Sequence, residues 1–236
     1  MIFAPSQRSN KLEMLDTIDC KPEHLKLNLR EIAKFNSVLK TRDAILSYVK
    51  LIIEINKLSG QIKILDLCAG SADIPVFIID WARKNNIDVK ITAIDIGEDI
   101  IRIAKEETVD YPEIESLAAD AFNLPYSENS FNIVICSQAF HHFKDEDCIR
   151  LLKIMYQLCS NGIIVNDLRR AWINYLGAMT LTRLWNFSEM GLNDAPLSVL
   201  RAFTKEEFLE LGKKAEIPNI KCHSFFTHSL QLVAYK

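Results

Sequence analysis

The stretch that decides the fold is Ile62-Lys-Ile-Leu-Asp-Leu-Cys-Ala-Gly-Ser-Ala-Asp73, followed further along by Ile91-Thr-Ala-Ile-Asp95. The sequence here contains an apolar run, a turn of small residues, an amphipathic segment and a second apolar run that ends in an acid. This order is typical of a strand-helix-strand unit. These segments form a strand, a helix and a parallel strand that hold a nucleoside cofactor at the carboxyl edge of a sheet. The functional residues are therefore expected at that edge.

Apolar runs and amphipathic segments alternate from Ile62 onward. The pattern predicts strands at 62–67, 89–94, 116–119, 131–136 and 163–166, and helices at 72–84, 98–107 and 145–158. Near-continuous apolar strands between amphipathic helices favour a parallel sheet that is covered on both faces. The expected fold is α/β and doubly wound, with a mostly parallel, seven-stranded, Rossmann-like sheet.

Helical patterns flank this alternating region. Two amphipathic helices are expected within residues 1–58, as an N-terminal helical cap of the same domain, and the catalytic domain is expected to span 59–236 with a helical insertion at about 170–200. Thr204-Lys-Glu-Glu207 has the capping-box form that begins a helix. Two β-rich runs, 220–227 and 230–235, predict a closing hairpin that adds an antiparallel strand.

The composition limits the expected binding partners and the expected cellular location. The 236 residues are 49% hydrophobic and 25% charged, with a net charge of −3, so no general attraction to nucleic acid is expected. The six cysteines show no zinc-type spacing, so we expect reduced thiols and no metal. Without an export signal or a long apolar run, the expected location is the cytoplasm with no membrane span, as a monomer or homodimer.

The first turn favours a cofactor without a pyrophosphate. Only Gly70 stands where a dinucleotide site needs several glycines, which suits an adenosyl group with an amino-acid tail. Asp95 follows its strand where a carboxylate can accept from both ribose hydroxyls, or can cap the next helix instead. Asp120 can accept from an exocyclic amine, and Phe122 can lie against a purine.

These segments resemble the successive motifs of class I S-adenosylmethionine-dependent methyltransferases. The resemblance covers residues 62–167 and rests on four segments: Leu65-Asp-Leu-Cys-Ala-Gly-Ser-Ala72, Asp95, Ala119-Asp-Ala-Phe-Asn-Leu-Pro-Tyr126 and Ser130-Phe-Asn-Ile-Val-Ile-Cys-Ser-Gln-Ala-Phe-His-His-Phe143. It is nearest to the small-molecule branch that includes ubiquinone, menaquinone and polyketide-associated methyltransferases. The family pattern has glycine where this chain has Cys68 and Ala72.

The resemblance implies S-adenosyl-L-methionine as cofactor, S-adenosyl-L-homocysteine as product, and a set of contact residues. The methionine part would lie beside Asp66, Ala69, Gly70 and Ala72, the ribose at Asp95 and Ile96, and the adenine at Asp120, Ala121 and Phe122. Ser137, Gln138, Phe140 and His141 would face the transferred methyl group. The acceptor is expected to be small and hydrophobic, aromatic, quinone-like or polyketide-like, and methylated at carbon or oxygen.

Methyl transfer from a sulfonium is an in-line displacement, for which alignment supplies most of the assistance. An acceptor such as a phenol also needs a base, and His141 or His142, one at most, is the candidate. Asp167, Arg169 and Arg170 could anchor an acidic acceptor or form an ion pair. The aromatic run from Trp172 to Met190 is expected in the core, or as a roof over a closed apolar acceptor pocket.

Two alternatives remain open from the sequence. A non-catalytic methyltransferase-like scaffold fits the departures at Cys68 and Ala72. A nicotinamide-dependent oxidoreductase fits the strand-helix-strand pattern but lacks the glycines of a pyrophosphate cradle. Cofactor binding discriminates among the three.

Overall fold

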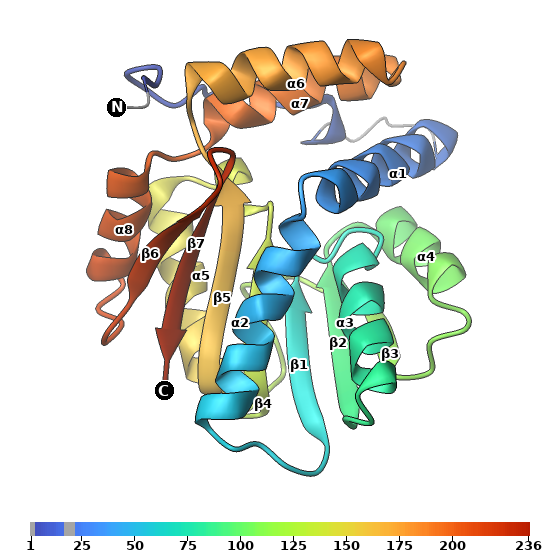
Figure 1. Ribbon diagram of the computed structural model, residues 1–236, viewed down its shortest axis with the longest axis vertical. Helices are drawn as coiled ribbons and strands as arrows, with labels where there is room; N and C mark the ends of the chain where they lie inside the picture. The colour runs from blue at the N-terminus through green and yellow to red at the C-terminus, as the bar shows by residue number, and fades with distance from the viewer. Residues whose placement is uncertain (1–2, 17–21) are drawn as a thin grey trace.

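A single seven-stranded sheet forms the centre of the protein. The computed structural model describes residues 3–16 and 22–236 and places the strands in the order β3-β2-β1-β4-β5-β7-β6 (Figure 1). The strands are β1 (Ile62–Leu67), β2 (Val89–Asp95), β3 (Ile114–Ala118), β4 (Phe131–Ser137), β5 (Cys159–Leu168), β6 (Lys221–Phe225) and β7 (Ser229–Tyr235). The first five are parallel, and β7 pairs antiparallel with both β5 and β6. The predicted doubly wound fold with a closing hairpin is confirmed.

Two separate hydrophobic clusters cover the two faces of the sheet. One face packs against α2 (Thr41–Ile55), α3 (Asp73–Lys84) and α4 (Glu98–Glu107), through side chains such as Val49, Ile78 and Ala104. The other packs against α5 (Asp145–Leu158) and α8 (Lys205–Lys214), with Leu152 and Phe208 buried. Strand β1 is buried on both faces except at Lys63, which accounts for its near-continuous apolar sequence.

The remaining helices lie over one end of the sheet. In Figure 1, α1 (Pro22–Val38), α6 (Trp172–Leu184) and α7 (Glu189–Arg201) lie beyond the arrowheads of the parallel strands. Two short 3₁₀ helices, η1 (Met14–Asp16) and η2 (Phe140–His142), complete this region, and η1 contacts α7. The carboxyl edge of the sheet therefore has a helical cover drawn from both the start and the later part of the chain.

The differences from the predicted elements are in length and position. Strand β3 begins at Ile114 rather than Ser116, and β5 extends from Cys159 to Leu168 because it has a partner on each side, β4 and β7. The aromatic run after β5 divides into α6 and α7. Among the described residues no helix is long and apolar enough to cross a membrane. Five cysteines are unpaired, and Cys20 lies outside the described residues.

The predicted capping box is present at the start of α8. Thr204 Oγ1 accepts from Glu207 N at 3.3 Å, and Glu207 Oε2 accepts from Thr204 N at 2.8 Å. Two backbone N–H groups at the helix terminus thereby gain partners.

Replacing Thr204 with alanine is expected to lower the free energy of unfolding by about 1 kcal/mol, because it removes the cap. Urea denaturation measures this change. Thr180→Ala is the matched control: Thr180 is exposed in the interior of α6, where its hydroxyl bonds Leu176 O, so its loss should change stability little. Equal effects of the two substitutions would contradict the assigned role of the capping box.

Candidate functional site

The turn after β1 has an unusual backbone. Cys68, Gly70 and Ala72 all have positive φ angles, of 56°, 56° and 62°, and Ala72 is the N-cap of α3. A positive φ costs a side-chain-bearing residue roughly 1–2 kcal/mol. The two positions at which the chain departs from the family's glycines therefore keep the glycine-like conformation. A β-carbon on Gly70 would lie 3.7 Å from the Leu29 side chain, so α1 lies directly over the turn.

Asp95 joins the turn to the end of β2. Its Oδ2 accepts from Gly70 N and its Oδ1 from Gly97 N, both at 3.1 Å. Burial raises the pKa of Asp95, and these backbone bonds act against that rise. Asp95 therefore orders the loop before α4, whose N-cap is Gly97 and has no side-chain cap, and its contact with the ribose stays a prediction. Ile96 beside it is 76% exposed.

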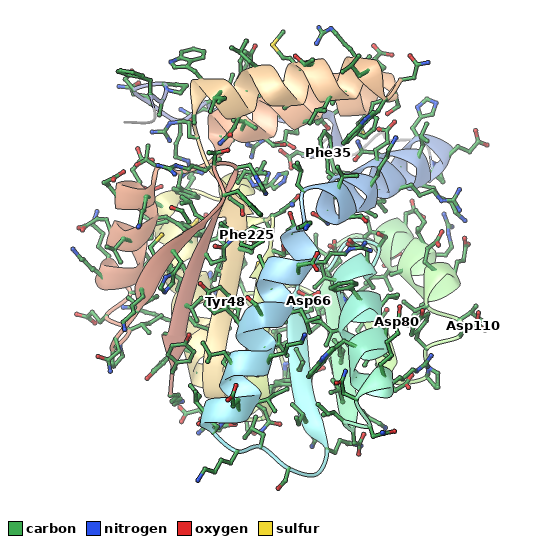
Figure 2. All side chains as sticks on the ribbon, viewed as in Figure 1. Phe35, Tyr48, Asp66, Asp80, Asp110 and Phe225 are labelled. Atoms are coloured by element: carbon green, nitrogen blue, oxygen red, sulfur yellow. The ribbon has the colours of Figure 1, made fainter. Side chains whose placement is uncertain are left out.

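Three carboxyl groups meet at this end of β1. Burial raises the pKa of Asp66 well above its usual range, and the neighbouring Asp73 and Asp95 raise it further. Burial likewise raises the pKa of Asp73. Asp66, labelled in Figure 2, is only 2% exposed, and its Oδ1 has no hydrogen-bond partner among the described residues. A buried group of this kind favours a positively charged or hydrogen-donating ligand.

Asn36, in α1, connects this acidic group to the loop after β4. Its Nδ2 donates to Asp73 Oδ2 at 3.2 Å, and its Oδ1 accepts from Gln138 Nε2 at 2.6 Å. Gln138 has a positive φ of 52°, directly after β4. Sequence reasoning missed Asn36, because no pattern marks one polar residue of an amphipathic helix as a partner of the turn.

The predicted adenine residues lie together after β3. Asp120 is exposed and accepts from Phe122 N at 2.9 Å, while Ala121 is buried. The Phe122 ring meets Phe143 edge-on with centroids 5.5 Å apart, and the Arg150 guanidinium lies 5.0 Å from its centre. Ser137, at the end of β4, accepts from Asn166 Nδ2 at 3.3 Å.

The two histidines lie in a second polar cluster after β4. His141 Nδ1 lies 2.6 Å from Asp167 Oδ1, and His141 N donates to Asp167 Oδ2 at 2.9 Å. Burial alone would raise the pKa of Asp167, but the contacts with His141 outweigh burial and hold that pKa below its usual value. His142 Nδ1 lies 2.7 Å from Asp16 Oδ1. Both imidazoles therefore have a carboxylate partner at Nδ1.

Glu13 covers the other side of both histidines. Its Oε1 lies 3.7 Å from His141 Nε2, and its Oε2 lies 3.9 Å from His142 Nε2. Burial raises the pKa of Glu13 to about 7. Sequence reasoning did not find Glu13 or Asp16, because these acids precede the histidines by more than a hundred residues and follow no local pattern.

The structure assigns Asp167 and Arg170 to internal contacts, which corrects the idea that they anchor an acceptor. Arg170 is 1% exposed, and it donates to Pro5 O at 3.0 Å, Ala202 O at 2.7 Å and Glu207 Oε1 at 2.6 Å. Its guanidinium joins the N-terminal segment to the start of α8. The ion-pair partner of Arg170 is Glu207, whose side chain is 39% exposed, rather than Asp167.

The aromatic run after β5 has two different environments. Trp185 and Phe187 pack against Phe35 of α1, with ring centroids 5.3 Å and 5.1 Å from it, and Phe35 is labelled between α1 and the α6/α7 pair in Figure 2. By contrast, Trp172 is 48% exposed and Leu184 is 73% exposed. The prediction that the run lies in the core holds for Phe187 and Met190, and is wrong for the outer side of α6.

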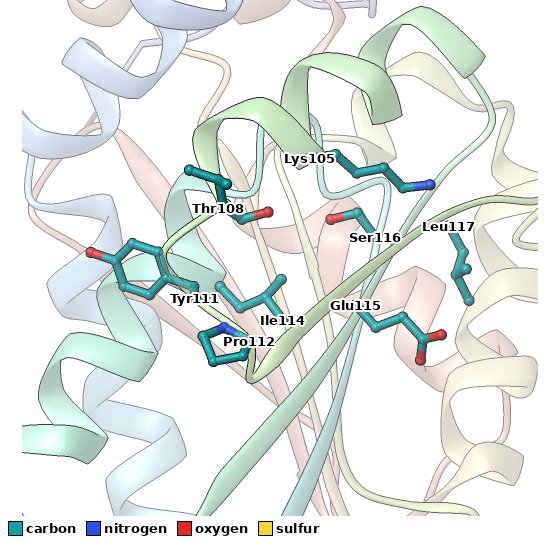
Figure 3. A pocket seen from close by; sticks show the side chains of 9 residues that line it. Lys105, Thr108, Tyr111, Pro112, Ile114, Glu115, Ser116 and Leu117 are labelled. Carbon is teal, nitrogen blue, oxygen red and sulfur yellow. The ribbon is translucent and has the colours of Figure 1, made fainter.

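A surface depression lies elsewhere, at the free edge of β3. It has a volume of about 380 Å³ and is lined by residues between Lys105 and Leu117, including Tyr111 and Glu115 (Figure 3). Its lining contains none of the predicted site residues, so we do not assign it to the cofactor. The predicted closed acceptor pocket stays a prediction.

Comparison with known proteins relates this chain to methyltransferases. Residues 64–162 match a family model described as a methyltransferase domain. The chain is 25% identical to the demethylmenaquinone methyltransferase of Thermotoga maritima, over 79% of this chain and 80% of that protein. It is 27% identical to the demethylmenaquinone methyltransferase of Staphylococcus epidermidis RP62A, over 44% of this chain and 41% of that protein. Several curated relatives, like the latter, are thus matched over less than half of their length.

A solved structure shows the same fold over nearly the whole chain. The plantazolicin methyltransferase BpumL, in complex with S-adenosylhomocysteine, has a TM-score of 0.67 at 13% identity, covering 91% of this chain and 95% of that one. The protein therefore has the fold and the domain of class I S-adenosylmethionine-dependent methyltransferases. S-adenosylmethionine is the cofactor of this class, and the buried Asp66 is consistent with such a cationic ligand.

Replacing Arg170 with methionine is expected to destabilise the protein by about 3 kcal/mol, because buried carbonyl oxygens lose their donor. Chemical denaturation measures the loss. Arg183→Met serves as the control, since Arg183 is exposed and bonds the carbonyl of Met179 in its own helix. If Arg170→Met kept full stability but lost binding of an acidic acceptor, the original acceptor-anchor assignment would be restored.

Proposed function

We propose that this protein transfers a methyl group from S-adenosylmethionine to a small apolar acceptor, aromatic, quinone-like or polyketide-like, at carbon or oxygen. The observation that carries the proposal is the buried, unpartnered Oδ1 of Asp66 at the end of β1. The cofactor supplies a methyl group on a positively charged sulfonium, together with an ammonium group. The demethylmenaquinone methyltransferase names of two relatives support the quinone-like class of acceptor.

Specific residues have assigned tasks in this proposal. Asp66, Ala69, Gly70 and Ala72 bind the methionine part, Asp95 and Ile96 the ribose, and Asp120, Ala121 and Phe122 the adenine. Ser137 and Gln138 lie beside the methyl-transfer position. The cap of residues 1–58 and the insertion at about 170–200 exclude water from the catalytic domain at 59–236, which strengthens electrostatic contacts within the site.

An acceptor that reacts as an anion must lose a proton, and the cluster of His141 and His142 is where we place that step. Asp167 at Nδ1 leaves Nε2 of His141 as the acceptor nitrogen, and it stabilises the ring if it becomes positively charged. His141 is held more rigidly than His142, since Asp167 also accepts from its backbone N–H. His141 is therefore the preferred of the two.

Calorimetric titration with S-adenosylmethionine and S-adenosylhomocysteine, with reduced nicotinamide dinucleotide as the control, tests the cofactor assignment. Micromolar binding of the first two alone would support the proposal and justify assays with phenolic, quinol and polyketide acceptors. Binding of only the nicotinamide would favour an oxidoreductase. No binding by folded protein would favour a methyltransferase-like scaffold, in which Cys68 and Ala72 close the turn.

Asp95→Ala is expected to weaken binding of S-adenosylhomocysteine at least 10-fold, about 1.4 kcal/mol, because the ribose contacts are lost. It also frees Gly70 N and Gly97 N, so circular dichroism must first show an intact fold. The matched control is Asp99→Ala in α4, whose carboxylate forms an exposed ion pair with Arg102. Unchanged affinity in Asp95→Ala would remove Asp95 from the cofactor site.

His141→Asn should reduce turnover by about 100-fold or more, with little change in affinity for S-adenosylhomocysteine. Asparagine retains an N–H that can donate to Asp167, which limits the structural cost. Single-turnover assays measure the effect, and His142→Asn provides the comparison. Full activity in both variants would remove the histidines from the reaction.

A further inference from the structure

Three side chains from two distant segments place potential metal-binding atoms close together. One carboxylate oxygen of Glu13 and one ring nitrogen from each of His141 and His142 all lie within 4.8 Å of one another. Glu13 Oε1 lies 3.7 Å from His141 Nε2, and Glu13 Oε2 lies 3.9 Å from His142 Nε2. Two atoms bound about 2.1 Å from a tetrahedral ion lie about 3.4 Å apart, so small side-chain movements bring these atoms to binding distance.

The far side of each imidazole is already fixed. His141 Nδ1 lies 2.6 Å from Asp167 and His142 Nδ1 lies 2.7 Å from Asp16, so each Nδ1 carries the hydrogen when the ring is neutral. Each Nε2 then has its lone pair directed away from those carboxylates. A carboxylate behind a histidine is the common arrangement around protein-bound metal ions, because it orients the ring and raises its basicity.

Glu13 supplies an independent indication of a missing ligand. The residue is 3% exposed, and within residues 3–16 and 22–236 its Oε1 has no hydrogen-bond partner. The Ser198 side chain lies beside the same carboxyl group and lowers its pKa. The nearest guanidinium, Arg201, has its Nε 3.6 Å from Glu13 Oε1 but donates elsewhere. The Arg201 guanidinium donates hydrogen bonds to His141 O, His142 O, Lys11 O and Asp16 Oδ2.

The charges in contact with the cluster leave room for a cation. The acidic groups of Glu13, Asp16 and Asp167 outnumber the one guanidinium, Arg201, that contacts them. Asp194 also lies near enough to Glu13 to raise its pKa further. A divalent cation bound among these groups gains favourable electrostatic contacts. Arg8 nearby is already paired with Asp145 at 2.7 Å.

We propose that Glu13, His141 and His142 bind a divalent transition-metal ion of the Zn²⁺ type. Two imidazole nitrogens and one carboxylate suit Zn²⁺, Mn²⁺ or Fe²⁺ better than Ca²⁺, which takes oxygen ligands. His142 keeps 20% of its side chain exposed, so a fourth position can face solvent or an acceptor. This proposal replaces the sequence-based expectation that no metal is bound.

The bound ion has a structural consequence and a catalytic one. It ties the N-terminal segment at Glu13 to the loop after β4, across the carboxyl edge of the sheet. In addition, and resting on the proposed function, an acceptor hydroxyl in the fourth position would have its pKa lowered by the ion. The hydroxyl proton would leave to solvent water on the partly exposed His142 side, and the ion would take the place of the free His141 base in forming the acceptor anion.

Metal binding is tested on untagged, metal-stripped, full-length protein. Co²⁺ is the spectroscopic probe, since its visible absorption reports coordination, and Zn²⁺ competition gives the affinity. The expected result is one Co²⁺ per chain, displaced by Zn²⁺. Glu13→Gln, which keeps the size of the side chain, and His142→Gln, at a partly exposed position, should each weaken binding at least 10-fold.

Glu31→Gln is the matched control, because Glu31 is another buried glutamate of the N-terminal region, bonded to Ser188 rather than to the histidines. It should leave Co²⁺ binding unchanged. Absence of binding by the parent protein, or equal binding by folded Glu13→Gln and His142→Gln variants, would overturn the proposal. Circular dichroism establishes that each variant is folded.

Binding of S-adenosylhomocysteine to the same metal-stripped protein separates this inference from the proposed function. Cofactor binding without Co²⁺ binding would reject the metal site alone. Co²⁺ binding without cofactor binding would reject the proposed function and keep the metal site with its structural role.

Discussion

The register of the parallel strands is the constraint on which the rest of this structure depends. Leu67 at the end of β1 pairs with Ile94 of β2 on one side and with Cys136 of β4 on the other, and Ser137 pairs with Asn166 of β5. The strands therefore end almost level with one another. Because the strands are parallel, the residues that follow each of them lie at the same edge of the sheet. Acidic residues that follow different strands therefore become neighbours.

That edge concentrates buried carboxyl groups, and the structure treats them differently. Burying a carboxylate without partners is costly, so donors normally accompany it. Asp167 is hydrogen-bonded to the backbone N–H and the ring of His141, and Asp95 accepts from two backbone N–H groups. Asp73 accepts a hydrogen bond from the Asn36 side chain. Asp66 alone among these four retains an unpartnered buried oxygen. This difference is the reason why we place the proposed cofactor contact at Asp66.

Sequence reasoning succeeded where the determining forces are local. The apolar run at Ile62 and the amphipathic period of α5 were located to the residue, because burial on a sheet or a helix face leaves a regular pattern. Sequence reasoning failed where a feature depends on contacts with residues that are distant in the chain. The length of β5 depends on its antiparallel contact with β7, and the exposure of Trp172 depends on which side of α6 meets α7. Asn36 and Glu13 acquire their roles from contacts that no spacing encodes.

The N-terminal segment has the reverse of the usual burial pattern. Its apolar Phe3 and Leu12 are 75% and 69% exposed, while its Glu13 is 3% exposed. Leu15 of this segment packs against Leu25 and Leu29, and polar contacts with Arg201, Asp194 and the histidines also hold the segment in place. Local departures from the folding pattern concentrate at functional sites, because there a residue is retained for what it binds. Glu13 is such a departure, because it is buried beside two oriented imidazoles while the neighbouring Leu12 is exposed. The proposed cation would explain why a glutamate is buried at this position.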